Sequence, residues 1–124
     1  MQARDWIGTG AVLAATGVAA GAFGAHGLEG RVAPDLLEIW RTAAHYHLVH
    51  AVALLGVAWV VDRGAHGAAL AGWLLVVGVA VFSGSLYLLT LTGVRTLGAI
   101  TPIGGVALIA GWVVLAVAAW RSRS

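Results

Sequence analysis

The side chains of this protein that can do chemistry are mainly imidazole and hydroxyl groups, and they are grouped along the chain. Four of the five histidines lie between positions 26 and 50, and a run of serine, tyrosine and threonine residues lies between positions 83 and 101. Such groups hydrogen-bond polar ligands, and histidine also takes up a proton near neutral pH. Our candidates for a shared polar ligand pocket are His26, Tyr46, His47, His50, Ser83, Ser85, Tyr87 and Thr101.

His47 and His50 are three positions apart, so we interpret them as sharing one helical face, and we place His50 at the depth of Ser83 or Ser85. Three interpretations of these imidazoles stay open. They form a hydrogen-bonded layer that fixes helix register, or they bind a ligand or pass a proton, or His47 and His50 share a metal or haem site with His26. No carboxylate is predicted at that depth, so the metal is left unknown, and we expect no cofactor.

An imidazole that faces hydrocarbon loses its hydrogen bonds, at a cost of about 1–3 kcal/mol. We therefore predict that both of these histidines point into the protein. At least one of them should hydrogen-bond a hydroxyl group between positions 83 and 87.

No catalytic motif accompanies these groups. Ser83-Gly84-Ser85 lacks the pattern of a nucleophile elbow between a strand and a helix. The glycine-rich run from Gly21 to Gly27 contains no lysine and follows no predicted strand, which excludes a phosphate-binding loop. The chain has no cysteine, which excludes disulfides and thiolate chemistry. We expect a protein that is not an enzyme.

The composition of the chain indicates an integral membrane protein. Of its 124 residues, 60% are hydrophobic and 10% are charged, and the mean hydropathy is +0.94. An ordinary soluble domain has about 25% charged residues, which it needs to cover its surface. The charges are spread along the chain and form no patch for nucleic acid. We expect a bacterial inner-membrane protein in contact with the lipid bilayer and with no nucleic acid.

Charge-free windows of about 20 residues are long enough to cross a bilayer as helices. Four such windows lie at about residues 6–25, 42–61, 68–91 and 101–120. They predict a single all-α domain over residues 1–124, an up-down-up-down four-helix membrane bundle. The first window resembles a signal peptide, but Asp5 cancels the charge of Arg4, so we expect a retained span.

Two prolines mark predicted helix starts. Thr101 fits an N-cap, with Pro102 at the first helical position. Pro34 opens a helix that continues into the second span, with Asp35 in its first turn. Residues 34–41 then form an amphipathic extension at the membrane interface, ahead of the second span.

The up-down topology places both termini on one side of the membrane. Four tryptophans then lie near that side, as their preference for interfaces predicts: Trp6, Trp59, Trp73 and Trp120. Trp40 lies near the other side, and Trp112 lies in mid-span. The arginines on the terminus side are Arg4, Arg63, Arg121 and Arg123, against Arg31, Arg41 and Arg95 opposite, a balance that slightly favours cytoplasmic termini.

The chain has 18 glycines, and small residues in membrane helices mark close helix contacts. We predict that Gly17, Gly21, Gly104 and Gly111 face other helices. These seams hold the four helices together, or one of them binds a second copy, so a homo-oligomer and a larger membrane complex both stay open.

Several motifs together resemble one family, called domain of unknown function 423. They are Gly21-Ala-Phe-Gly-Ala-His-Gly-Leu28, Thr42-Ala-Ala-His-Tyr-His-Leu-Val-His50, Phe82-Ser-Gly-Ser-Leu-Tyr-Leu88, Leu97-Gly-Ala-Ile-Thr-Pro-Ile-Gly-Gly105 and Gly111-Trp112. Its members are small bacterial inner-membrane proteins of the YgdD type, and human transmembrane protein 256 is similar to them. The resemblance covers nearly the whole chain and implies four membrane helices and the same polar residues, with no activity attached.

We expect a multi-pass membrane protein that binds or passes a small ligand, a lipid headgroup or a proton at the polar pocket, in one half of the membrane. The alternative is a structural or accessory subunit that packs against a larger membrane complex. A minor alternative is the metal or haem site.

Overall fold

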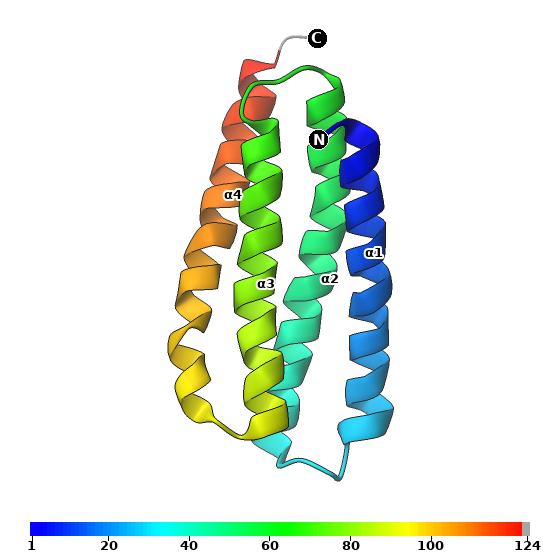
Figure 1. The fold of residues 1–124 in the computed structure, drawn as a ribbon, viewed down its shortest axis with the longest axis vertical. Coiled ribbons are helices and arrows are strands. Elements are labelled where there is room, and N and C mark those ends of the chain that lie inside the picture. Colours follow the sequence, from blue (N-terminus) through cyan, green and yellow to red (C-terminus); the bar gives the residue numbers. More distant parts are fainter. Residues whose placement is uncertain (123–124) are drawn as a thin grey trace.

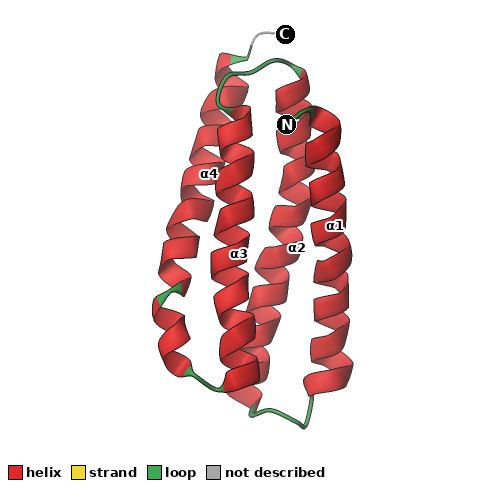
Figure 2. Cartoon of the chain, in the orientation of Figure 1, coloured by secondary structure: helices red, strands yellow, loops and turns green. Residues whose placement is uncertain are grey.

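The structure is a computed structural model that describes residues 1–122, so Arg123 lies outside the described residues. The described chain is almost entirely helical (Figure 2). In chain order its elements are α1 (Ala3–Phe23), the π-helical turn η1 (Gly24–Leu28), α2 (Pro34–Asp62), α3 (Ala68–Thr92), the 3₁₀ turn η2 (Arg95–Ala99) and α4 (Thr101–Arg121). The four α-helices are long and apolar enough to cross a membrane, which confirms the predicted all-α, four-helix membrane fold.

The ends of the helices follow from a few local features. Pro34 occupies the first turn of α2, as predicted, and Gly67 and Gly93 take positive φ angles on either side of α3. At the start of α4 the prediction is wrong, because Ile100 is the N-cap and the Thr101 hydroxyl does not cap the helix. That hydroxyl instead bonds the Ser85 hydroxyl on α3.

The helices run alternately up and down, with both described ends of the chain at the same end of the molecule (Figure 1). Each helix packs mainly on its neighbour in sequence: α1 on α2, α2 on α3, and α3 on α4. Contacts between α2 and α4 are few, and within residues 1–122 α1 and α4 do not form a packed pair. The bundle is therefore open, with a shared core that includes Trp6, Leu54, Leu75, Val79 and Leu108.

The predicted extension continues α2 without a break (Figure 1). α2 has 29 residues, and at 1.5 Å per residue it is about 43 Å long, more than the roughly 30 Å hydrocarbon core requires. Leu37 on the extension is buried, while Glu38 and Arg41 are exposed, which is the predicted amphipathic pattern. Asp35 accepts a hydrogen bond of 2.6 Å from Arg95 of η2, which links the start of α2 to the connection between α3 and α4.

The tryptophans fall into two groups that the sequence did not separate. Trp59, Trp73 and Trp120 are exposed, as expected for residues at a membrane interface. Trp6 and Trp40 lie near the predicted ends of their helices, and Trp6 contacts the Trp73 ring at 5.6 Å. With 0% and 6% of their surfaces exposed, they face the protein core and not the lipid. Each packs over a glycine of another segment: Trp6 of α1 over Gly72 of α3, and Trp40 of α2 over Gly24 of η1.

The glycine prediction holds for α4 and for Gly17, and it is wrong for Gly21. A Cβ at Gly104 or Gly111 would strike α3, and one at Gly17 would lie 2.8 Å from Leu48 Cδ2. Nothing lies within 4 Å of a Cβ at Gly21. The line that faces α2 repeats every seven residues, about two helical turns, and contains Gly10, Gly17 and Gly24. Gly21 lies off that line.

Candidate functional site

Two hydroxyl groups of α3 set the register between α2 and α3. The Ser83 hydroxyl donates to the carbonyl oxygen of Ala43 at 2.8 Å, and the Thr90 hydroxyl donates to that of Leu36 at 3.1 Å. Both bonds fit one antiparallel register, in which His50 lies opposite Val76, about two turns away from Ser83. The prediction that His50 shares the depth of Ser83 or Ser85 is therefore wrong.

The His47 side chain lies between α1 and α3 and is nearly buried. Its Nδ1 lies 2.8 Å from the Tyr87 hydroxyl and its Nε2 lies 3.1 Å from the Thr16 hydroxyl. The contact with Tyr87 confirms the predicted hydrogen bond to a hydroxyl group of the third span. We call His47, Thr16, Tyr87 and Ser83 the His47 cluster.

Both ring nitrogens of His47 have hydrogen-bond partners in either of two arrangements of the hydrogen atoms. The Thr16 hydroxyl also reaches the carbonyl oxygens of Val12 and Leu13, at 3.1 and 3.0 Å. If it donates to one of them, it accepts from Nε2–H of His47, and Nδ1 then accepts from Tyr87. In the opposite arrangement Thr16 donates to Nε2, and Nδ1–H donates to the Tyr87 oxygen. Tyr87 can thus be either donor or acceptor.

Tyr87 is held in place by Trp40. The two rings lie 4.5 Å apart between centroids, and Trp40 Nε1 donates to the carbonyl oxygen of Ala20 at 2.7 Å. Gly24 leaves room for the indole ring, since a Cβ there would lie 2.6 Å from Trp40 Cδ1. The phenol of Tyr87 therefore has a fixed position next to His47.

His50 is bound differently. Its Nδ1 lies 2.6 Å from the carbonyl oxygen of Tyr46, and Trp112 Nε1 donates to its Nε2 at 3.0 Å. A carbonyl oxygen only accepts and an indole N–H only donates, so this geometry requires a neutral imidazole with its hydrogen on Nδ1. We call His50, Tyr46 and Trp112 the His50 cluster.

His47 and His50 do not share one pocket, which corrects our interpretation of their spacing. Three residues correspond to a rotation of about 60° short of a full turn. On α2 that rotation turns His47 toward α1 and α3, and His50 toward α4. The predicted single pocket is therefore two clusters on different sides of α2.

The remaining candidates lie apart from both clusters. Ser85 and Thr101 bond each other at 2.6 Å, across α3 and α4. His26 is exposed in η1, and its side chain takes part in none of the side-chain hydrogen bonds of the described residues. Within residues 1–122 no three side chains of the metal-binding types come together, so His26, His47 and His50 do not form the suggested shared metal site.

Two members of the clusters were not predicted from the sequence, although a signal for each is present in it. Thr16 is a hydroxyl group in the middle of the charge-free first window. Trp112 is the tryptophan in mid-span, away from the interfaces that indole groups prefer. A mid-span polar group needs a partner, and the histidines of α2 supply one to each.

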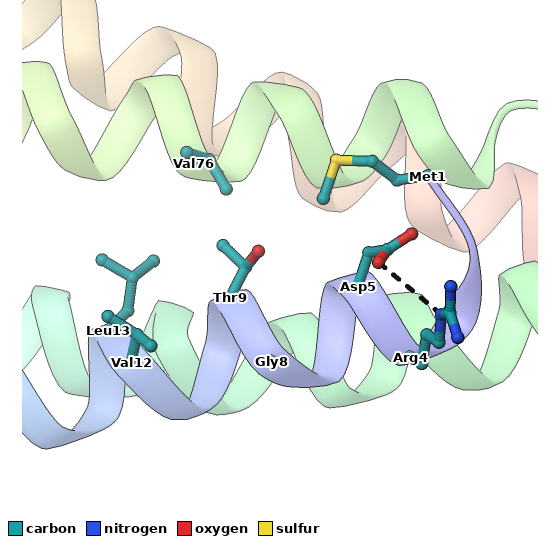
Figure 3. Close-up of a pocket in the computed structure, with 8 residues that line it drawn as sticks. All are labelled: Met1, Arg4, Asp5, Gly8, Thr9, Val12, Leu13 and Val76. Carbon is teal, nitrogen blue, oxygen red and sulfur yellow. Dashed lines mark ion pairs between the residues drawn. The ribbon is translucent and has the colours of Figure 1, made fainter.

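A groove runs between α1 and α3 and reaches the His47 cluster. Its inner part is a hollow of about 200 Å³ lined by His47, Ser83 and Tyr87 together with apolar side chains. Its outer part, a hollow of about 680 Å³, continues toward the N-terminus and has Leu13 and Val76 in common with the inner part (Figure 3). We call the two hollows together the α1–α3 groove.

A second hollow lies on the other side, between α2 and α4. It has a volume of about 320 Å³ and is lined by all members of the His50 cluster and by Phe82 and Leu108. The Tyr46 ring stacks between Phe82 and His50, with centroids 4.4 and 5.9 Å away. We call it the α2–α4 groove.

Comparisons with known proteins give a family and no activity. Residues 20–105 match the model of a family described as "Protein of unknown function (DUF423)". The chain is 48% identical over 118 residues to UPF0382 membrane protein YwdK of Bacillus subtilis, covering 94% of this chain and 96% of that protein. It is 50% identical over 115 residues to a UPF0382 membrane protein of Staphylococcus epidermidis, covering 93% and 94%. No solved structure matches the chain.

Proposed function

Since the chain belongs to the DUF423 family, whose function is unknown, and has four helices that can cross a membrane, we propose its role from its own geometry. It binds a small, largely apolar molecule with one hydrogen-bonding group, taken from the bilayer into the α1–α3 groove. The polar group of this ligand contacts Tyr87, and His47 supports that contact. The role is one of binding and involves no enzymatic step.

The observation that carries the proposal is the hydrogen-bond chain from Thr16 through His47 to Tyr87, at the wall of the inner hollow. Because the chain can run in either direction, Tyr87 can accept a hydrogen bond from a ligand or donate one to it. A ligand hydroxyl, carbonyl or carboxyl group is therefore matched without a charged side chain.

The size and walls of the groove support this class of ligand. The inner hollow of about 200 Å³ is smaller than the roughly 300–1,000 Å³ of sites for drug-sized molecules. Apolar side chains such as Leu13, Val76 and Val79 line most of it. The outer hollow extends the apolar surface toward Met1 and offers space for a longer chain (Figure 3).

The test uses an aliphatic alcohol that carries a diazirine on its chain as the probe. After illumination of the protein in vesicles, we expect cross-links at the facing segments of α1 and α3, near Leu13 and Val76. Tyr87→Phe removes one hydroxyl and should lower the cross-link yield about fivefold, the effect of one hydrogen bond of about 1 kcal/mol.

Tyr46→Phe is the matched control, because it removes the same group from the α2–α4 groove. It should leave the yield at α1 and α3 unchanged. Equal yields for all three proteins, or cross-links spread evenly over the lipid-facing surfaces, would contradict the proposal.

A structural or accessory role is the second candidate, and the closed hydrogen bonding favours it. His47, His50 and Ser83 all have partners within the protein, as in a layer that only fixes helix positions. If the role is structural, the probe should give no specific cross-link. A larger membrane complex should then co-purify with the protein, and it should still do so with the Tyr87→Phe variant.

A further inference from the structure

A separate hollow of about 330 Å³ lies between the start of α3 and the last turns of α4. These segments lie at the end of the molecule where both described ends of the chain are found (Figure 1). Its wall is apolar and consists mainly of Val113, Val114 and Val117 of α4. Its rim carries His66, from the connection before α3, and Arg121, from the last turn of α4. The sequence did not predict that the valine wall and the two rim residues lie together.

The rim carries positive charge that the described chain does not neutralise. Within residues 1–122 Arg121 forms no ion pair. Among the described residues the acidic side chains at this end of the molecule are those of Asp5 and Asp62, and neither lines the hollow. Asp5 is already engaged by the Gln2 backbone N–H and lies 4.0 Å from Arg4.

The hollow also lies at the depth of lipid headgroups. Trp120, with 83% of its surface exposed, precedes Arg121, and the exposed Trp73 lies in the second turn of α3. Exposed tryptophans on membrane proteins collect at the level where headgroups meet acyl chains. The rim is therefore at headgroup level, and the valine wall extends from it toward the hydrocarbon.

The start of α3 adds to the attraction for an anion. Gly67, which lines the hollow, is its N-cap, and no side chain caps the helix. α3 has no acidic residue in its first turn, whereas α1 has Asp5 and α2 has Asp35. The N–H groups of the first turn of α3, of which that of Ala68 bonds the carbonyl oxygen of Ala65 at 3.5 Å, and the positive end of the helix dipole face the same end of the molecule as Arg121.

We propose that this hollow binds an anionic phospholipid, with its phosphate at Arg121 and His66 and one acyl chain along the valine wall. A guanidinium group matches phosphate oxygens in charge and geometry, and an imidazole N–H donates a further hydrogen bond. A zwitterionic lipid brings its own cation to the rim and is bound less well. The site is independent of the α1–α3 groove, so either proposal can fail without the other.

The experiment places the full-length protein in phosphatidylcholine vesicles that contain a minor fraction of phosphatidylglycerol with a diazirine in one acyl chain. We expect cross-links concentrated in residues 113–121. Arg121→Gln should lower their yield about tenfold, because it removes a charge-assisted hydrogen bond. Phosphatidylcholine with the same diazirine should show no such concentration.

Two further variants separate the site from general surface charge. Arg63→Gln removes an arginine at the same end of the molecule. The Arg63 guanidinium lies 4.9 Å from the centre of the Trp59 ring and does not line the hollow. This variant should therefore leave the cross-link yield unchanged. Val117→Trp fills the hollow without changing the charge and should lower the yield. Equal losses in Arg63→Gln and Arg121→Gln, or full cross-linking in Val117→Trp, would overturn the proposal.

Discussion

The ring nitrogens of His50 face groups of fixed character, a carbonyl oxygen on one side and an indole N–H on the other. Those of His47 face two hydroxyl groups, each of which can donate or accept. His50 is therefore restricted to one neutral form and acts as a structural residue. His47 has more freedom, which is why the proposed ligand contact is assigned to its cluster.

Replacing His50 should affect stability according to what remains for Trp112. In His50→Gln the side-chain oxygen can still accept the indole N–H, so we expect a loss of about 1 kcal/mol, the value of the other hydrogen bond. His50→Leu leaves the indole N–H without an acceptor and should cost about 1–3 kcal/mol more. Unfolding by dodecyl sulfate in mixed micelles measures both. A leucine variant as stable as the glutamine variant would show that Trp112 finds another acceptor.

At the scale of single residues the sequence predicted the need for partners better than it predicted where they lie. The cost of an unpaired imidazole in hydrocarbon led to the contact between His47 and a hydroxyl of α3, which the structure contains. The side of α2 on which each histidine lies depends on which helices flank it. The spacing of His47 and His50 along the chain does not determine which helices flank α2, so the two clusters were predicted as one.

Of the glycines in α4, Gly104 approaches α3 most closely. A Cβ there would overlap the backbone of Phe82 and lie 2.9 Å from the carbonyl oxygen of Gly78. A Cβ at the next residue, Gly105, would meet only the Phe82 ring, at 3.8 Å. The two neighbouring glycines thus form a matched pair, one with backbone against it and one with space.

We expect Gly104→Ala to separate the two helices and destabilise the protein by about 1–3 kcal/mol, the usual range for overpacking. Gly105→Ala should be neutral or stabilise by up to about 1 kcal/mol, because alanine favours helix. The same unfolding assay compares them. Similar stabilities for the two variants would contradict the close packing at Gly104.

The same comparison applies within α1. A Cβ at Gly10 would lie 2.8 Å from the carbonyl oxygen of Ala51, which is backbone and cannot move aside easily. Gly10→Ala should therefore destabilise by about 1–3 kcal/mol, whereas Gly21→Ala should be neutral or slightly stabilising. The free energies of unfolding of the two variants in mixed micelles test this expectation. A large loss of stability in Gly21→Ala would support the helix contact at Gly21 that was predicted from the sequence.

At the scale of helices the spans were predictable because charges and apolar length alone define them. Their bounds follow the windows closely, and Pro34 marks the start of α2. The face of each helix that packs was harder to predict. In a chain with 18 glycines many lines of small residues exist, and only the neighbouring helix determines which line is used.

The whole molecule is an open arrangement in which α2 and α3 are central and α1 and α4 lie outermost. α1 reaches α3 mainly through Trp6, whose ring lies over Gly72 and makes an edge contact with Trp73 at 5.6 Å. Openness of this kind leaves room for the α1–α3 and α2–α4 grooves, which a closed ring of helices would fill. The sequence predicted four antiparallel helices, but short connections fit closed and open bundles equally well.

Paired cysteines can test this arrangement, since the chain has no cysteine of its own. Ala68 of α3 and Ala118 of α4 belong to one buried cluster, so cysteines at these positions should form a disulfide on mild oxidation. Cysteines at Ile7 of α1 and Val117 of α4 lie on helices that do not pack together and should stay reduced within one molecule. Gel mobility with and without reductant reports the bond.

A closed bundle would place α1 beside α4, so an efficient intramolecular bond between Ile7→Cys and Val117→Cys would contradict the open form. A bond that appears instead as a dimer would show that at least one of these two positions lies at a contact between copies.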